Sequence, residues 1–501
     1  MIAERLLEGR AVARRLNRYL HLRIPTVLAG GETFALDVTL FGPDNLPADE
    51  GVSIRFEGCR GLEGLPPSVD LPSGRNGMWT LPGLRAIGPE LVLVRGMVGE
   101  DEVLSNPAWV FDVPPYRIYW GDLHVHTSFS NCHAWACKSP EFCYEFARDA
   151  ARLDFAAAAD HTRGLAAAAD RWPRLQQCAR DYEAPGAFAA LLAFESSHAQ
   201  GFGGDNNVYF KGTEGPLFWL ERPDMRGHAP KVRLEELWDW LDAAGHEFFS
   251  VPHHTGRRGK YRTFSDPTYD PRREPLFEIY SSWGSSEMRH TAFPLSGGNN
   301  DDQGYFVDAL RHGCRYGVLA ASDSHTTMPG GEARSWKKPL GVTPLNGFHH
   351  GGLAAVRCAA LERSSIWTAL RQRQCYGTTF ARVPLDFQVG GVPMGSAAPV
   401  GRADPLRKRR RMALRFTTTA GGDASVTILR NGQPWRRQVR AWNEPHGAVE
   451  ELVVEDEEPL AAVAVREARF HPAPFVVYYA RLETGDGQTQ WTSPVWLDVD
   501  G

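Results

Sequence analysis

Four short polar clusters, each placed where an apolar run with strand character ends, constrain the fold of this chain most strongly. They are GDLHVHT at 121–127, ADH at 159–161, VPHH at 251–254 and SDSH at 322–325. Glu195 closes the apolar run AALLAFE in the same way. Histidine and carboxylate groups are costly to bury without partners, so packing alone does not explain them at five strand ends. Converging on one pocket, they would form a site for several divalent metal ions.

The composition is that of an ordinary globular protein. At 501 residues, with 43% hydrophobic and 23% charged residues, the chain is too long for one core, and we expect two or three domains. A net charge of −5 gives no support to nucleic-acid binding, which usually needs a basic face. The sequence has no apolar run of about eighteen residues, so we expect no membrane-spanning helix.

The first residues of the sequence and its cysteines indicate in which cellular compartment we expect the protein. Residues 1–20, MIAERLLEGRAVARRLNRYL, mix charged and apolar residues and lack the apolar core of a secretory signal. We expect an amphipathic helix there that packs on the body of the protein. The eight cysteines show no paired spacing, so we expect reduced thiols and a cytoplasmic protein.

The middle of the chain alternates between strand-like and helix-like segments from Tyr116 onwards. Ser139 and Pro140 provide a cap and a first-turn proline for one helix, and a second amphipathic helix stops at Gly245. The apolar runs LDFAAAAD, EFFSVPHH, EPLFEIYSSW, YGVLAASDSH and GLAAVRC read as strands. Alternating β and α units favour a parallel sheet, and chemistry at successive strand ends favours a closed or nearly closed β/α barrel.

The flanking segments read as all-β. Residues 20–113 contain the alternating run ETFALDVTLFG and the buried-strand run LVLVRGMVG. In the C-terminal part the helical period disappears, and Asn431 and Gly432 mark a hairpin turn. We interpret the basic run Arg407–Arg411 as a solvated loop, with an anion-binding patch as the weaker alternative. The predicted α/β architecture has three parts: an N-terminal helix plus β-sandwich (1–115), a metal-binding β/α barrel (116–383) and a C-terminal β-sandwich (384–501).

Strand geometry explains why these residues suit metal ions. Alternate residues of an extended strand point the same way, so His124 and His126 can face one ion. Asp323 and His325 share a face in the same way. Glu195 can bridge two ions because a carboxylate has two oxygens, and neutral imidazoles suit zinc, manganese or iron. An isolated His-x-His pair is more often an ordinary surface feature, whereas three further clusters in chain order favour ligands.

Two of the clusters leave alternatives open. Asp160 and His161 end an alanine-rich strand, and such a pair alone is more often a capped turn than a metal site. Of His253 and His254, we expect only one to reach the metals, and we prefer His253 because it directly follows the strand.

The order and context of these segments resemble the PHP (polymerase and histidinol phosphatase) superfamily of metallohydrolases, at the motifs GDLHVHT, DFAAAADH, FE, PHH and SDSH. The phrases YRIYWGDLHVHTSFS, EIYSSWGSSE, ASDSHTTMPGG and WTSPVWLD are similar to a subgroup with β domains on both sides, which includes carbaryl-hydrolase-like enzymes. The resemblance covers residues 106–501. It implies a distorted (β/α)₇ barrel with a centre of two or three divalent metal ions.

The resemblance also implies which residues hold each ion. The first ion would be held by His124, His126, Glu195 and Asp323, the second by Glu195 and His253 with one more ligand, and the third by His161 and His325 with a residue from the loop after HVHT.

This chain departs from the family pattern at two places. Many relatives have a histidine or aspartate in the loop after the second histidine of HVHT, at the position where this chain has Cys132, followed by His133. Asp205 and Asn206 stand where a histidine ligand is common, which weakens the second position or leaves it more open. The predicted metal ligands are His124, His126, Cys132, Asp160, His161, Glu195, His253, Asp323 and His325.

The chemistry expected at such a centre is hydrolysis. Two cations about 3.5–4 Å apart lower the pKa of a bridging water to give metal-bound hydroxide near neutral pH, and they polarise the scissile P=O or C=O group. The leaving group then needs a proton or a positive neighbour. The candidates for this catalytic role are His254, His133 and Arg163.

The loop GRRGKYR at 256–262 follows one of the predicted ligands and is strongly basic. Folded over the metals, it would bind a phosphate or another anion. A plain exposed basic loop is an equal alternative. The substrate-binding candidates are Arg257, Arg258 and Lys260.

We therefore predict a metal-dependent hydrolase of an ester-type bond, with phosphoesters favoured and Zn, Mn or Fe as the cofactor. Two alternatives stay open: carboxyl ester, carbamate or amide hydrolysis at the same metals, and a non-catalytic PHP scaffold stabilised by metal. The expected partner is a small-molecule ester, without nucleic acid or membrane, and self-association into a homo-oligomer is left open.

Overall fold

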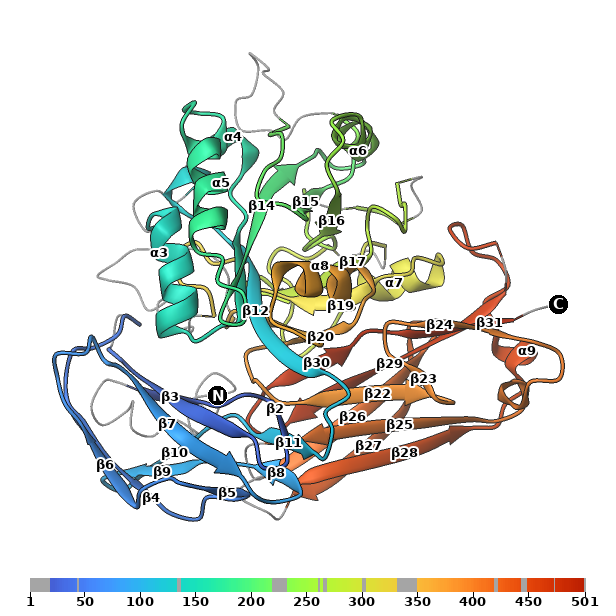
Figure 1. Ribbon diagram of the computed structural model, residues 1–501. Helices are drawn as coiled ribbons and strands as arrows, with labels where there is room; N and C mark the ends of the chain where they lie inside the picture. The colour runs from blue at the N-terminus through green and yellow to red at the C-terminus, as the bar shows by residue number, and fades with distance from the viewer. Residues whose placement is uncertain are drawn as a thin grey trace.

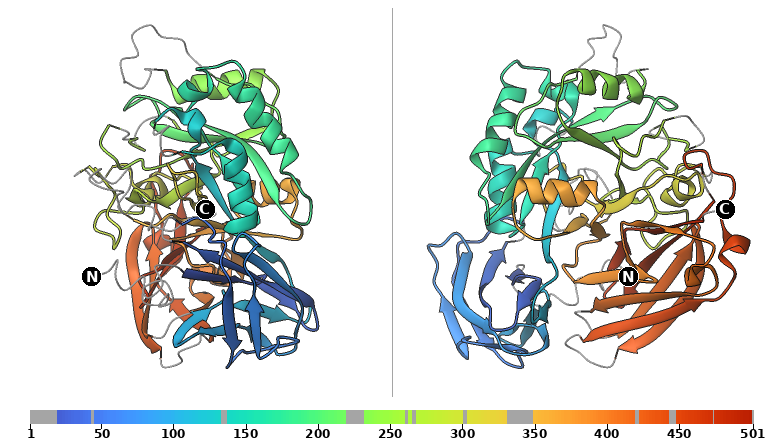
Figure 2. Two further views of the ribbon diagram at one scale, coloured as in Figure 1. Left: turned by 90° about the vertical axis from the view of Figure 1, so that its left-hand side faces the viewer. Right: turned by 45° about the vertical axis from the view of Figure 1, so that its right-hand side comes forward.

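The computed structural model has three lobes (Figures 1 and 2). An α/β lobe lies above two β-rich lobes, the N-terminal one in blue and the C-terminal one in orange and red (Figure 1). The helix predicted over residues 1–20 lies outside the described residues, apart from Tyr19 and Leu20 at the start of β1. The described residues are 19–42, 45–132, 137–218, 232–259, 262–264, 268–299, 303–330, 349–418, 422–442, 448–472 and 474–499.

The N-terminal lobe is β-rich, as its alternating sequence predicts. Its sheets have the strand orders β1–β3–β7–β5, β10–β9–β4–β6 and β2–β11–β8. Leu36, Val38, Ile54 and Trp79 pack in their shared core, because alternate side chains of a strand face the same way. The strands are β1 (Tyr19–Arg23), β2 (Val27–Ala29), β3 (Thr33–Phe41), β4 (Val52–Phe56), β5 (Leu62–Glu63), β6 (Ser68–Leu71), β7 (Met78–Ala86), β8 (Glu90–Val92), β9 (Arg95–Val98), β10 (Asp101–Leu104) and β11 (Ala108–Phe111).

The α/β lobe contains the predicted alternation of strands and helices. Its strands are β12 (Arg117–Val125), β13 (Phe155–Ala158), β14 (Ala189–Ser197), β15 (Asp205–Phe210), β16 (Phe248–Pro252), β17 (Leu276–Ser281), β18 (Gly284–Ser285), β19 (Gly317–Ala320), β20 (Leu353–Cys358) and β21 (Cys375–Thr378). Its helical segments are η2 (Ser128–Ser130), α3 (Pro140–Glu145), η3 (Phe146–Ala150), α4 (Thr162–Leu165), α5 (Arg171–Asp181), α6 (Leu234–Ala243), α7 (Phe306–Arg311) and α8 (Arg363–Arg371). Ser139 caps α3 as predicted, its hydroxyl accepting a hydrogen bond from the Phe142 N–H.

The strand pairing does not close into the predicted (β/α)₇ barrel. Strands β12, β13 and β14 are parallel, but β15 runs antiparallel between β14 and β16. On the other side, β12 pairs antiparallel with β20, and β17, β18 and β19 form a separate small sheet. The segment between β14 and β15 is short, so the chain turns back there instead of crossing over through a helix.

Side chains from both sheets of the α/β lobe nevertheless share one core. Leu123, Phe155 and Leu191 from the large sheet pack in one cluster with Leu276 and Leu319 from the small sheet. Helices α3 and α5 lie together on one outer side of this lobe (Figure 1). The strands are therefore arranged around a common interior although their ladder stays open.

The C-terminal lobe continues the large sheet, because β21 pairs with β30 and the order runs on through β29, β26 and β27. The predicted hairpin at Asn431 and Gly432 joins β26 to β27, and both residues have the positive φ that this turn needs. The elements are β22 (Leu385–Val389), β23 (Val392–Pro393), β24 (Ala397–Val400), η5 (Pro405–Arg407), β25 (Arg410–Thr417), β26 (Gly422–Arg430), β27 (Gln433–Trp442), β28 (Val449–Asp456), α9 (Leu460–Val463), β29 (Phe475–Thr484), β30 (Thr489–Thr492) and β31 (Val495–Val499).

One residue of the basic run Arg407–Arg411 contradicts the interpretation as a solvated loop. Arg410 begins β25 and is fully buried, with its guanidinium 2.8 Å from Asp456 and 3.1 Å from the Tyr478 hydroxyl. Arg411 is exposed and pairs with Glu451 on the neighbouring strand. The two residues of the run that lie in β25 therefore point to opposite sides of the strand, Arg410 inside and Arg411 outside.

A buried carboxylate ties the α/β lobe to the C-terminal lobe. Glu287 follows β18 and accepts hydrogen bonds from the Tyr479 hydroxyl, the Trp491 indole N–H and the Arg481 guanidinium, each 2.9 Å long. All three donors lie on β29 and β30, so one side chain fixes these strands against the α/β lobe.

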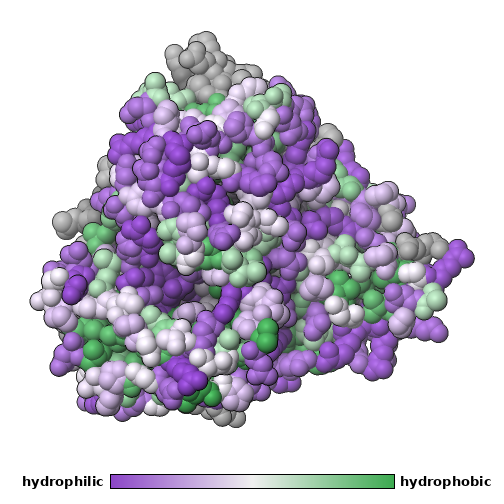
Figure 3. Space-filling model, in the orientation of Figure 1, coloured by the Kyte–Doolittle hydropathy of each residue, from purple (hydrophilic) through white to green (hydrophobic). Residues whose placement is uncertain are grey.

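The surface seen in Figure 3 mixes hydrophilic and hydrophobic residues without one continuous apolar face. In the part of the chain that the structure describes, no helix combines the length and the apolar character needed to cross a lipid bilayer.

Candidate metal centre

The predicted strand ends do meet. Val125 at the end of β12 bridges Ser324, and the backbone N–H of His126 donates to the Ser324 carbonyl at 2.8 Å. His161 bridges Glu195 in the same parallel manner. These backbone contacts bring HVHT, SDSH, ADH and the end of β14 together, so side chains distant in the sequence face one interior.

The first group of converging side chains contains His124, His126 and Asp323, whose ligand atoms all lie within 4.8 Å of one another. The Asp323 carboxylate lies 3.1 Å from His126 Nε2 and 3.6 Å from His124 Nε2. Glu195 lies 3.4 Å from His126 Nε2. This arrangement agrees with the four residues that the family resemblance implies for the first ion.

The second group lies on the other side of Glu195. His253 Nε2 is 3.2 Å from Glu195 Oε1, and His124, Glu195 and His253 form one set of converging ligand atoms. Asp205, His253 and His254 form another, with His254 Nε2 3.0 Å from Asp205 Oδ2. Asp205 therefore adds a carboxylate to this second group, and His254 lies in it as well as His253.

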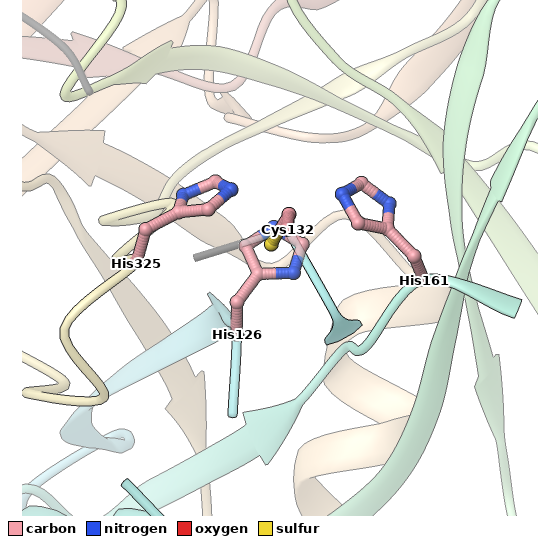
Figure 4. A group of neighbouring side chains, drawn as sticks. All are labelled: His126, Cys132, His161 and His325. Carbon is pink, nitrogen blue, oxygen red and sulfur yellow. The ribbon is translucent and has the colours of Figure 1, made fainter. Parts of the chain in front are cut away.

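The third group contains Cys132, His161 and His325, together with His126. Figure 4 shows the imidazoles of His161 and His325 facing each other across Cys132 and His126. The ring centroids of His126 and His325 are 4.1 Å apart, and those of His126 and His161 are 4.6 Å apart. His133 lies outside the described residues.

Unpaired buried atoms test whether these residues fit metal ions. His124 Nε2, His253 Nδ1 and His254 Nδ1 are buried and have no hydrogen-bond partner among the described residues. An unsatisfied buried polar atom costs about 1–3 kcal/mol, so three in one cluster are not explained by protein contacts. All three belong to side chains that bind divalent cations. The residues therefore fit divalent metal ions.

The histidines differ in their electrostatic environment. Burial lowers the pKa of His126, and burial together with the neighbouring His126 lowers the pKa of His325 well below its usual value, so both rings are neutral, as metal ligands must be. Burial also acts to lower the pKa of His161, but the Glu195 carboxylate and Cys132 together outweigh it and raise that pKa to about 10. The protonated His161 ring thus places a positive charge beside the Glu195 carboxylate. A bound cation would take the place of this charge.

Surrounding residues orient the candidate ligands. Glu278 lies 3.0 Å from His124 Nδ1, and the Ser130 hydroxyl lies 2.8 Å from His126 Nδ1, so each ring presents its Nε2 to the centre. Asp160, predicted as a ligand, has both oxygens engaged elsewhere: it accepts hydrogen bonds from Thr127 and Ser130. The structure thus places Asp160 behind the ligands, where it holds the turn that orients His126.

Two candidate ligands have a backbone conformation that is unfavourable for residues other than glycine. His254 and Asp323 have φ values of 31° and 50°, which side-chain-bearing residues seldom adopt. Such conformations cost about 1–3 kcal/mol each and persist where the surroundings impose them. Here they turn both side chains toward the centre directly after β16 and β19.

The arginines and the lysine predicted to act in catalysis or substrate binding differ in burial and in surroundings. Arg257 is half-buried and lies over the Trp283 ring, with Cζ 3.9 Å from its centroid. Arg258 is exposed, and so is Arg163 on α4; the described residues offer neither a hydrogen bond nor an ion pair to the Arg163 side chain. Lys260 lies outside the described residues. Of these cations, Arg257 is the one that the structure places beside the metal-ligand groups.

Two residues of the site are absent from the predicted ligands. Asp205 was named only as standing where a histidine ligand is common. It begins β15, and because β15 is antiparallel to β14, its start lies at the same edge as the end of β14. Glu278 lies inside the apolar strand β17 and is buried. A single carboxylate within the run PLFEIY was the available signal, since an isolated buried charge requires a partner.

Comparison with known proteins gives relatives without a described activity. The chain is 26% identical over 460 residues to an uncharacterized protein of Chlamydia pneumoniae, a match that covers 91% of this chain and 69% of the relative. An uncharacterized protein of Chlamydia trachomatis is 24% identical with the same coverage. No protein-family model matches the chain.

Among solved structures, a two-domain protein from Bacteroides vulgatus, described as containing a predicted PHP-like metal-dependent phosphoesterase, matches 73% of this chain and 90% of its own. The identity is 12% and the TM-score is 0.34. At these values the likeness carries no argument about activity, and what the site can do has to be judged from its own residues.

Proposed function

We propose that this protein is a metal-dependent hydrolase that cleaves phosphoesters. The observation that carries the proposal is the cluster of histidines, aspartates and Glu195 with three unpaired buried histidine nitrogens. The first ion would be held by His124, His126 and Asp323, and the second by His253, His254 and Asp205, with Glu195 between them. Bound divalent ions would supply an activated water and polarise the bond to be broken.

Arg257 supports a phosphoester over a neutral ester. Its guanidinium is half-buried on Trp283, and no described carboxylate lies within ion-pair distance of it. Burial lowers the pKa of Arg257, while the charges of Asp323, Asp205 and Glu195 act in the opposite direction, which places the arginine near the same carboxylates. Guanidinium groups bind phosphate oxygens with paired hydrogen bonds. Arg257 is therefore suited to hold the substrate phosphate beside the metals.

The position of Arg257 is fixed by its backbone. The Arg258 N–H donates to the Gly297 carbonyl at 2.8 Å, and the Asn299 N–H donates to the Gly256 carbonyl at 2.8 Å. Gly256 packs against the Tyr305 ring so closely that an added Cβ would lie 2.8 Å from it. The arginine is thus presented by an ordered segment, which reduces the entropy lost when substrate binds.

A substrate panel tests the proposal and its rival. The metal-loaded protein should cleave p-nitrophenyl phosphate faster than naphthyl acetate or a naphthyl carbamate. Cleavage of the acetate or carbamate with no activity on any phosphoester would replace the proposal with a carboxyl ester or carbamate hydrolase. No turnover of any of them, with metals bound, would favour a non-catalytic scaffold.

Replacing Arg257 with alanine should raise KM for p-nitrophenyl phosphate about 10- to 100-fold, because a hydrogen bond to a charged group is worth about 1.5–3 kcal/mol. Steady-state kinetics would measure this, with Arg258→Ala, which alters the exposed neighbour, as the matched control. Any residual hydrolysis of naphthyl acetate should be unchanged by Arg257→Ala. An equal loss on both substrates would contradict a phosphate-binding role.

A further inference from the structure

We infer that Cys132 makes the third metal position selective for zinc, whereas the other two positions accept harder cations such as manganese. This inference rests on the proposed metal centre and adds the identity of one of its ions. It follows from the donor atoms that converge on this position and from the way the loop that carries Cys132 is held.

Each histidine near Cys132 has its Nδ1 engaged. His161 Nδ1 lies 2.7 Å from Glu195 Oε2, and His325 Nδ1 lies 3.1 Å from the Asp323 carbonyl oxygen. His126 Nδ1 lies 2.8 Å from the Ser130 hydroxyl, and its Nε2 lies 3.1 Å from Asp323 in the first group. Orienting contacts of this kind are characteristic of metal-binding histidines. Because its Nδ1 is engaged, His126 can bind a metal only through Nε2, and Nε2 lies with the ligands of the first ion.

The third position is then left with Cys132, His161 and His325 as its protein ligands. Their ligand atoms lie within 4.8 Å of one another, and the set contains no carboxylate. Three protein ligands with room for a fourth, non-protein ligand is the arrangement of catalytic zinc sites. A thiolate with two imidazoles is a soft donor set that suits zinc and disfavours manganese, which prefers oxygen.

The first and second groups have the opposite character. Each contains at least one carboxylate from Asp323, Glu195 or Asp205 beside its imidazoles. Mixed nitrogen and oxygen ligands bind manganese and iron as well as zinc. The two kinds of metal position thus differ in their donor atoms: the first and second groups add carboxylate oxygens to their imidazoles, whereas the third adds the sulfur of Cys132.

The loop that carries Cys132 is held in place by an arginine. Arg171 Nη1 donates to the Gly164 carbonyl at 2.7 Å, the Asn131 side-chain oxygen at 2.9 Å and the Phe129 carbonyl at 3.3 Å. An added Cβ at Gly164 would lie 2.0 Å from the Phe129 carbonyl, so the loop and α4 approach closely. Because His161 directly precedes α4, this clamp fixes Cys132 and His161 relative to each other.

Cobalt binding tests the sulfur ligand without measuring turnover. Cobalt(II) added to metal-free protein should produce a thiolate-to-cobalt charge-transfer band, which Cys132→Ser should remove. Cys59→Ser, a change at another half-buried free cysteine, is the matched control and should keep the band. Zinc affinity at this position should fall by at least about 100-fold in Cys132→Ser, the upper end of the cost of losing a residue that merely orients a ligand.

Alkylation of the unaltered protein tests the selectivity. Zinc should protect Cys132 of the metal-free protein from iodoacetamide, whereas manganese at the same concentration should not. Labelling of Cys59, followed in the same mass spectra, should be the same under all conditions. Equal protection by both metals, or by neither, would overturn the inference.

The outcomes separate this inference from the proposed function. Cobalt bound with no charge-transfer band would reject the sulfur ligand and leave the hydrolase proposal standing. A band that depends on Cys132, in a protein that cleaves no phosphoester, would uphold the third position and reject the proposed function. Absence of any bound cobalt or zinc would overturn both.

Discussion

Replacing Asp323 with asparagine is expected to lower kcat/KM for a phosphoester by about three orders of magnitude or more, because metal ions contribute several kcal/mol of charge stabilisation. Asparagine keeps the shape of the side chain and tolerates the positive φ of 50° found there, so the change removes charge with little added strain. Elemental analysis should show the loss of at least one ion. Kinetics on the same samples would give the rate.

The control for this variant is Asp423→Asn, a change to an exposed aspartate in β26. It should leave metal content and turnover unchanged. Chelation should inactivate the unaltered protein, and added divalent metal should restore it. Full turnover by Asp323→Asn would remove the first group from the catalytic site.

Replacing Glu287 with alanine is expected to lower the free energy of unfolding by about 3–5 kcal/mol, because it removes the fully buried carboxylate that pairs with Arg481 and leaves that mostly buried guanidinium only its longer contact with Glu483. The same change leaves the Tyr479 hydroxyl and the Trp491 N–H without their acceptor. Thermal unfolding followed by circular dichroism would measure the loss as a lower Tm.

Glu483→Ala is the matched control, since Glu483 is partly exposed and lies 3.5 Å from the same Arg481. An ion pair of that kind contributes about 0–1 kcal/mol, so Tm should change little. Similar losses from the two variants would show that the buried network does not hold the lobes together.

Local sequence rules predicted much of the fold. The cap at Ser139, the hairpin at Asn431 and the strands that end in histidine or aspartate follow from interactions between near neighbours in the chain, and the structure contains them. Because each cluster lies at a strand end, the sequence was also enough to predict that His124, His253 and Asp323 would meet.

The parts that were not predicted depend on pairing between distant segments. To predict whether a barrel closes, the direction of every strand must be known. The sequence of an apolar run such as β15 does not show whether the strand is parallel or antiparallel to its neighbours. Asp205 was therefore named only as a departure at a common ligand position and was not predicted as a ligand. Arg410 was misplaced because its partner Asp456 lies on another strand, and a charge run does not reveal which member is buried. Those features follow from long-range contacts that local periodicity does not encode.

Strand β21 is an interior strand only because β30 pairs with it. A fragment cut near residue 384 would leave without partners those backbone N–H and C=O groups of Tyr376–Thr378 that face β30. Exposed edge strands of this kind pair with strands of other chains and lead to aggregation. The α/β lobe therefore cannot be cut out of the molecule at that point, and any shortened version has to keep β30 or replace it with a substitute strand.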